Sequence, residues 1–188
     1  MARRGLDRDQ VVDAAVAIAD AEGVEAVTLA RVAAMLGVRP PSLYNHVDGR
    51  AGLLRGVATR STRELATALR RAATGRSGRA AIAAVAHAQR DYARAHPGGY
   101  AATVAAPAPG DTEHQEAAAD AVDVLTSVLG GSGLEGDDLI HAVRALRSAV
   151  HGFAALEASG GFGLAVDADD SFRRLVDALA TGLAGDGP

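Results

Sequence analysis

The chain has 188 residues, of which 48% are hydrophobic and 3% aromatic, so it is long enough to bury a sizeable core built mainly from Ala, Val and Leu. It contains no Cys, which excludes disulfides and Cys-ligated metal sites. The basic start MARR is not followed by an apolar segment, and no uncharged run approaches the length of a membrane span. We therefore expect an unprocessed cytoplasmic protein with no membrane partner.

Charge is unevenly distributed along the sequence. Residues 1–79 hold 13 of the 19 basic residues and 8 of the 23 acidic residues, a net charge of +5, whereas the remaining residues carry −9. The overall net charge of −4 argues against a nucleic-acid partner, but a basic N-terminal part followed by an acidic remainder is typical of a DNA-binding domain joined to a second domain. A chance fluctuation of surface charge is the alternative.

The N-terminal part predicts three helices. The first begins after Asp7, which can cap it, and runs to a glycine. The second has Thr28 as its cap and an apolar stripe along one side, and it ends after two turns at Gly37. The third covers residues 41–46 and begins at a Pro-Pro pair, since Pro is tolerated in a first helical turn.

Longer helices are predicted for the rest of the chain. A long helix starts near Ala51, and further helical segments, separated by stretches rich in Gly and Pro, cover residues 79–96, 100–106, 112–129, 137–158 and 169–183. No stretch shows the sustained alternation of apolar and polar residues that predicts a strand. The fold class is therefore all-α, with one domain over residues 1–50 and a second over residues 51–188.

Two short helices joined by a tight turn have the spacing of a helix-turn-helix, whose second helix enters the major groove of DNA. In the third predicted helix, Leu43 and Val47 point the same way and form its core side. The outward side then carries residues able to face base edges or the DNA backbone. These are Pro41, Ser42 and Asn45 at the centre, with Tyr44 and His46 at the flanks.

Phosphate contacts are expected from Thr28, Arg31 and Arg50, because the positive end of the second helix and the arginines attract anions. The alternative for Tyr44 and His46 is a half-buried aromatic and an exposed histidine without a role in binding. Residues 28–47 and 49–54 closely resemble the DNA-binding domain of TetR-family regulators. The resemblance implies that Tyr44 and His46 contact the DNA backbone and that Arg50 holds a phosphate. The Pro pair at 40–41, preceded by Arg39, departs from the family pattern.

The C-terminal part is similar to the TetR-type domain named for a Trp-His-Gly motif. The similarity lies in residues 92–100 and 145–163, where His151-Gly152 is present and Val150 replaces the Trp. It implies a helical domain that dimerises and encloses a cavity for a ligand.

Two apolar stripes on the last predicted helices suit a four-helix bundle between two copies of the chain. The predicted homodimer interface consists of Ile140, Val143, Val150, Phe172, Leu175, Val176 and Leu179. The alternative is that both stripes face the core of their own chain. A polar stripe along the helix over 137–158, which includes His141 and His151, is most simply a solvated face.

A small, largely apolar ligand is expected within residues 80–165, where Ala and Gly leave room between helices. Scarce polar and aromatic groups in this region would orient the ligand, although each of them has a core role as its alternative. They are His87, Tyr92, Tyr100, Phe153 and Glu157.

These features predict a repressor that binds a pseudo-palindromic double-stranded operator as a homodimer and is released by a small molecule. A constitutive DNA-binding regulator without an effector is the alternative. No enzyme activity, metal or cofactor is expected, because the sequence has no HExxH, GxSxG or P-loop sequence and no GxGxxG in the context of a strand and helix.

Overall fold

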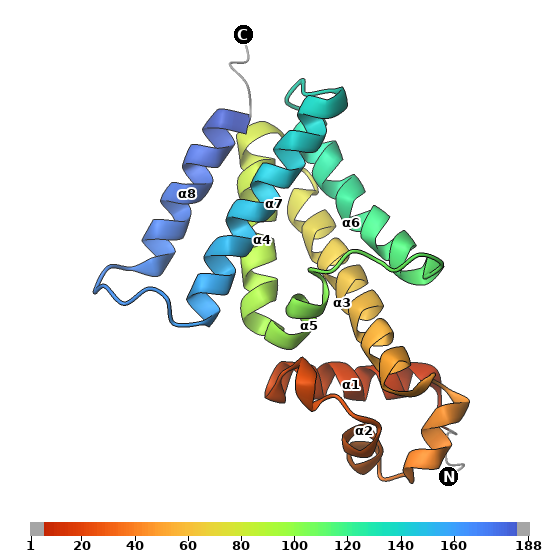
Figure 1. The fold of residues 1–188 in the computed structure, drawn as a ribbon. Helices are drawn as coiled ribbons and strands as arrows, with labels where there is room; N and C mark the ends of the chain where they lie inside the picture. The colour runs from red at the N-terminus through yellow and green to blue at the C-terminus, as the bar shows by residue number, and fades with distance from the viewer. Residues whose placement is uncertain (1–5, 184–188) are drawn as a thin grey trace. The chain divides into compact units, whose positions relative to one another are not determined.

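The computed structural model describes residues 6–183, and these form an all-helical structure without strands, as the sequence predicts (Figure 1). Its elements, in chain order, are α1 (Arg8–Glu22), η1 (Val24–Ala26), α2 (Leu29–Leu36), η2 (Pro40–Asn45), α3 (Gly49–Ala73), α4 (Gly78–Ala95), α5 (Pro97–Ala102), α6 (Thr112–Gly130), α7 (Gly136–Ala158) and α8 (Ala168–Leu183).

Two predicted helices differ from the structure. The segment predicted as a short α-helix over 41–46 is the 3-10 helix η2, which starts at Pro40. The segment predicted over 100–106 is α5, which starts at Pro97 and ends at Ala102. In both cases a Pro in the first turn sets where the helix begins, because its ring fixes a helical φ angle.

The described chain divides into two compact units. The first unit takes in the chain up to Glu64 together with His96–Ala118, and the second takes in Leu65–Ala95 together with the chain from Ala119. Helices α3 and α6 therefore each contribute residues to both units. Among the described residues, no helix is both long and apolar enough to cross a membrane.

The first unit packs α1, α2, η2 and the start of α3 around one apolar core. Side chains with no exposed surface at its centre include Val11, Ile18, Val32, Leu43 and Leu53. Helix α1 is fixed at its start by a capping box, in which Asp7 accepts a hydrogen bond from the backbone N–H of Gln10 and the Gln10 side chain accepts one from the backbone of Asp7.

Helix α5 lies directly against α1 within the first unit. A Cβ atom added to Gly98 would lie 2.0 Å from the carbonyl oxygen of Ala19, so only glycine fits at this position. Asp20 Oδ1 accepts a hydrogen bond of 2.7 Å from the backbone N–H of Gly99, and Asp20 Oδ2 lies 3.0 Å from His96 Nδ1. These contacts fix the register of α5 along α1.

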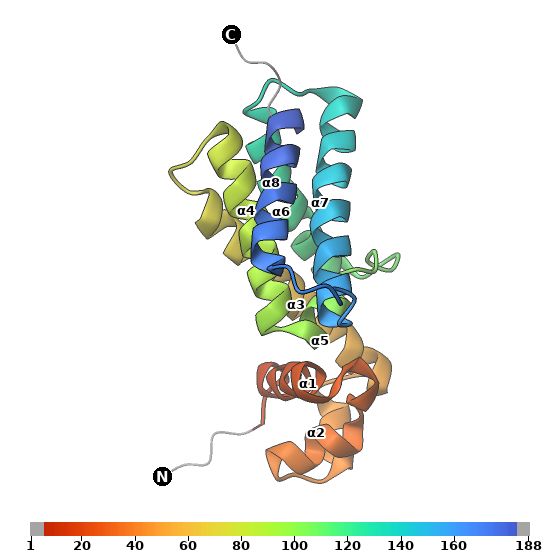
Figure 2. The ribbon, with the colours of Figure 1, turned by 90° about the vertical axis from the view of Figure 1, so that its left-hand side faces the viewer.

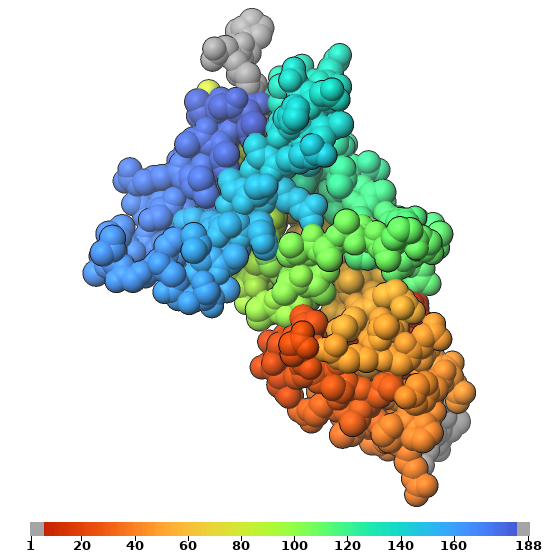
Figure 3. Space-filling model, viewed as in Figure 1, coloured from red at the N-terminus to blue at the C-terminus, as the bar shows by residue number. Residues whose placement is uncertain are grey.

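In the second unit, α4 contacts both α7 and α8, and α7 and α8 lie side by side (Figure 2). Phe172, Ile82, Leu129 and Leu146 are among its fully buried side chains. The connection between α7 and α8 lies on the surface of the unit in the space-filling view (Figure 3), and its residue Leu164 is 83% exposed.

Candidate DNA-binding interface

Helix α2 and the 3-10 helix η2 form the helix-turn-helix. Thr28 caps α2 by accepting a hydrogen bond of 3.2 Å at Oγ1 from the backbone N–H of Arg31. Gly37 ends the helix in the left-handed conformation at φ 67°, which a residue with a side chain rarely adopts. Arg39 then runs extended into the Pro pair that begins η2. The sequence thus specifies both ends of the turn.

Helix η2 has one buried side and one open side. Leu43 is fully buried and Val47, just after the helix, is 7% exposed, as the predicted core side requires. Tyr44 is 62% exposed, and Pro41 and Asn45 are exposed on the same element. The Tyr44 ring and the Asn45 amide are therefore exposed to solvent, while Leu43 and Val47 anchor the same segment in the core.

Ser42 and His46 are both half-buried. The Ser42 hydroxyl donates a hydrogen bond of 2.7 Å to the carbonyl oxygen of Arg39, so it stabilises the first turn of η2. Ser42 and Asn45 are the two side chains predicted to face base edges. Ser42 is bound to the Arg39 carbonyl, whereas Asn45 is exposed.

Arg50 is held by the segment η1 rather than extended into solvent. Its Nε donates a hydrogen bond of 2.9 Å to the carbonyl oxygen of Val27, and its Nη2 lies 2.9 Å from a carboxylate oxygen of Glu25. The Arg31 guanidinium pairs in the same way with Glu22. Both ion pairs lie at the surface, where such pairs contribute little, so a DNA phosphate can replace either carboxylate.

Arg39 is a further cation at this interface that the sequence interpretation did not place in it. It is exposed and is the N-cap residue of η2, directly before the Pro pair. Its position as a basic residue in the turn of the helix-turn-helix is the sequence feature that indicates a phosphate contact.

The residues predicted to bind a ligand are divided between the two units. His87, Phe153 and Glu157 do come together in the second unit, but around the buried side chain of Arg90. Tyr92 is buried in the second unit at 8% exposure, and Tyr100 is buried in the first unit.

Arg90 fills the space at the centre of this cluster. Its guanidinium lies 4.5 Å from the ring centroid of Phe172 and 5.0 Å from that of Phe153. It forms two hydrogen bonds to the carboxylate of Glu157, of 3.0 and 2.6 Å, and Arg94 forms two more. These bonds, above all those from Arg90, lower the pKa of Glu157 to about 2. Glu157 thus anchors an ion network.

Four of the seven predicted dimer residues belong to the core of their own subunit. Val150 and Phe172 have no exposed surface, Val176 is 1% exposed and Val143 is 7% exposed. For these four the structure corrects the prediction, because α4 covers the stripes that we expected a second copy to cover. Ile140 is 47% exposed, and Leu175 and Leu179 are half-buried.

Two family models match the sequence. The model of the bacterial regulatory proteins of the tetR family matches residues 11–57, which contain the helix-turn-helix. The model of the tetracyclin repressor-like C-terminal domain matches residues 82–179.

Individual proteins are similar to this chain over its length or part of it. An uncharacterized HTH-type transcriptional regulator of Mycobacterium tuberculosis is 37% identical over 179 residues, which are 95% of this chain and 82% of that protein. The HTH-type transcriptional repressor DrrR1 of Streptomyces coeruleorubidus is 55% identical over 49 residues, 26% of this chain and 18% of that one. The solved structure of a TetR variant from Acinetobacter baumannii in complex with minocycline shares the fold, with a TM-score of 0.71 at 22% identity, over 95% of this chain and 96% of that one.

Proposed function

The chain belongs to the TetR family of bacterial regulatory proteins, as a helix-turn-helix transcriptional regulator that binds DNA, and we propose that it is a homodimeric repressor whose operator is released when a small molecule binds. The proposal has three parts, namely the DNA contacts, the dimer and the effector. Repression is supported by the similarity of part of the chain to a protein named as a repressor.

The exposed face of η2 is the observation that supports the DNA contacts most directly. A tyrosine that is 62% exposed stands there next to an exposed amide, so an aromatic ring, a hydroxyl and an amide group are all accessible to a partner. In the proposed complex Tyr44 and His46 contact the DNA backbone and Asn45 faces base edges. Leu43 and Val47 keep this face rigid, because they pack into the core.

Phosphates on either side of η2 would be held by the N-terminus of α2 with Thr28 and Arg31, and by Arg39 and Arg50. Helix N-termini and arginines bind phosphate without reading sequence, so these groups set affinity and register. Each phosphate would displace Glu22 or Glu25 from its arginine, which costs little because both carboxylates are exposed.

The homodimer would form through the outward flanks of α7 and α8. On these flanks Ala145, Leu156 and Ala178 are exposed, and Leu175 is half-buried beside them. Small side chains allow two helices to approach closely, so two copies of this pair can form a four-helix bundle. This assignment keeps the helices that we predicted for the interface and one of the predicted side chains, Leu175.

The effector half of the proposal rests on helix α3, which contributes to both compact units. A ligand that shifts the part of α3 in the second unit therefore acts on the same helix that carries Arg50 at its start. Since two recognition helices must match the repeat of the DNA duplex, about 34–36 Å per turn, a small shift lowers affinity for the operator.

Two substitutions on η2 test the DNA contacts. Tyr44→Ala should weaken binding to every DNA sequence, whereas Asn45→Ala should change sequence preference at one base pair, by about 1–3 kcal/mol. Leu164→Ala removes an exposed apolar side chain in the second unit and serves as the control. Equal DNA affinity in Tyr44→Ala, Leu164→Ala and the unaltered chain would refute the proposed interface.

A further inference from the structure

A cavity lies in the second unit between the end of α3, the start of α4 and the C-terminal half of α6. Its volume is about 390 Å³. At about 30 Å³ per water molecule this is room for about a dozen non-hydrogen atoms, at the small end of the range for ligand sites. None of the side chains that we predicted to bind a ligand lines it.

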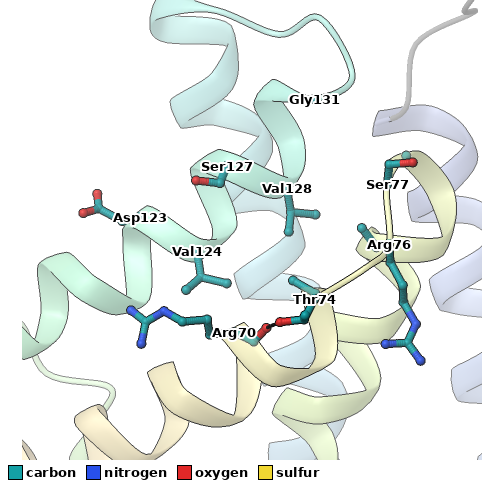
Figure 4. Close-up of a pocket in the computed structure, with 12 residues that line it drawn as sticks. Arg70, Thr74, Arg76, Ser77, Asp123, Val124, Ser127, Val128 and Gly131 are labelled. Carbon is teal, nitrogen blue, oxygen red and sulfur yellow. Dashed lines mark hydrogen bonds between the residues drawn. The ribbon is translucent and has the colours of Figure 1, made fainter.

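The wall of the cavity has an apolar side and a polar side (Figure 4). Val124 and Val128 project from α6 toward the end of α3, where Thr74 faces them. Ser77 and Ser127 add hydroxyl groups to the lining. The site thus suits a molecule with a short apolar body and a polar end.

Arg70 gives the polar end a positive charge. The side chain extends along the cavity beneath Val124 (Figure 4). Its nearest acidic partner is Asp120, at 3.8 Å, and both side chains are more than half exposed. An ion pair of that length and exposure contributes almost nothing, so Arg70 can bind an anion in its place.

The surrounding charges favour an anion as well. The sequence has no acidic residue between Glu64 and Asp91, so the lining that comes from the end of α3 and the start of α4 contains arginines but no carboxylate. Asp123 lines the rim, but its carboxylate points away from Thr74 and Val128 (Figure 4).

Arg76 has another role in the cavity wall. Its Nη1 donates a hydrogen bond of 2.8 Å to the carbonyl oxygen of Ala72, and its guanidinium points away from Val124 and Val128 (Figure 4). It therefore caps the end of α3, and Arg70 remains the group placed to recognise a ligand.

We propose that this cavity binds a small organic anion, with a carboxylate or phosphate at Arg70 and a short apolar body against Val124 and Val128. The step from binding to DNA release rests on the proposed function, because the anion would act on the end of α3 that belongs to the second unit. Binding itself does not depend on that function and is measured without DNA.

The test is calorimetric titration of the full chain with four probes of similar size. Octanoate and hexyl phosphate represent the two anion classes, and octanol and octylamine are the neutral and cationic controls. Arg70→Gln removes the charge from the lining, and Arg71→Gln removes the same charge from the neighbouring exposed residue, which does not line the cavity. Melting temperatures of the two variants verify that both fold.

The location of the ligand is tested separately. Because the chain has no Cys, Ser127→Cys places one thiol in the cavity wall and Ser148→Cys places one on the exposed side of α7. A bound anion should slow alkylation of the first thiol and leave the second unchanged. Equal rates at position 127 with and without a saturating anion would contradict the location.

At least one of the two anions should bind the unaltered chain and Arg71→Gln alike, and about fivefold more weakly to Arg70→Gln, the loss expected for an ion pair with a partly exposed arginine. Which of octanoate and hexyl phosphate binds more tightly distinguishes the carboxylate from the phosphate. Tighter binding of octylamine or octanol, or no Arg70-dependent binding of either anion, would overturn the proposal. A bound anion that leaves operator affinity unchanged would instead refute the effector half of the proposed function.

Discussion

Removing the charge of Glu157 should destabilise the second unit, because the substitution leaves a buried arginine without its main partner. The Arg90 side chain is 4% exposed and the Glu157 side chain 18% exposed, so water can replace little of what is lost. In Glu157→Gln the amide fills the same volume but cannot accept four charge-assisted hydrogen bonds. The packing of Phe153 and Phe172 around Arg90 is retained.

The magnitude follows from the pKa of Glu157, which falls from 4.5 to about 2 on folding. At 1.36 kcal/mol per unit, this corresponds to about 3 kcal/mol of folding free energy at neutral pH. Breaking a buried ion pair costs a similar amount, about 3–5 kcal/mol. Since the pKa is lower in the folded state, the contribution is complete above about pH 4.5 and is lost as the pH falls toward 2. About 2 kcal/mol of it should disappear between pH 7 and pH 3.

Urea unfolding at both pH values measures this effect. Glu157→Gln should be less stable than the unaltered chain by about 3 kcal/mol at pH 7, and the gap should narrow at pH 3. Asp170→Asn is the control, since Asp170 pairs with Arg173 and Arg174 on the surface of α8 and its removal should change stability little. A gap that is absent at pH 7, or that does not narrow with acid, would refute the reasoning.

Three other substitutions test the remaining parts of the account. Arg50→Ala should weaken binding to all DNA sequences and reduce the salt dependence of the binding constant by about one unit of slope, and an unchanged slope in a salt titration would exclude the phosphate contact. Ala178→Arg on the outward flank of α8 should give monomers in sedimentation, whereas Asp177→Arg on the other exposed flank of the helix should not; dimers in both would exclude the flank as the interface. Gly98→Ala should lower the free energy of unfolding in denaturant by about 3 kcal/mol, because the added Cβ would overlap a carbonyl group of α1. Gly163→Ala should be tolerated, because no atom lies within 4 Å of its Cβ position. Similar losses of stability in the two variants would contradict the close packing of α5 on α1.

Local signals in the sequence predicted the helices well. Thr28 as a cap and Gly37 as a left-handed end fixed the bounds of α2, because both act within a few residues. The type of η2 escaped prediction, since six residues carry too few turns for apolar spacing to separate a 3-10 helix from an α-helix.

Partners far apart in the sequence could not be predicted. Arg90 and Glu157 are 67 residues apart, and no local pattern indicates that they pair. The spacing of apolar residues identified the buried sides of α7 and α8. An apolar stripe has the same spacing whether α4 or a second copy of the chain covers it, so the sequence does not tell the two apart. Val150 and Phe172 were therefore assigned to the wrong partner.

The central claim, that this chain binds a two-fold symmetric operator through η2, is tested most directly by selecting bound sequences from random duplex DNA with the purified full chain. We predict enrichment of a pseudo-palindrome whose half-site centres lie one helical repeat apart, about 10 base pairs, or a multiple of it. Asn45→Ala should alter the preferred base at symmetric positions of the two half-sites. No enriched sequence, or an enriched site without two-fold symmetry, would contradict the claim.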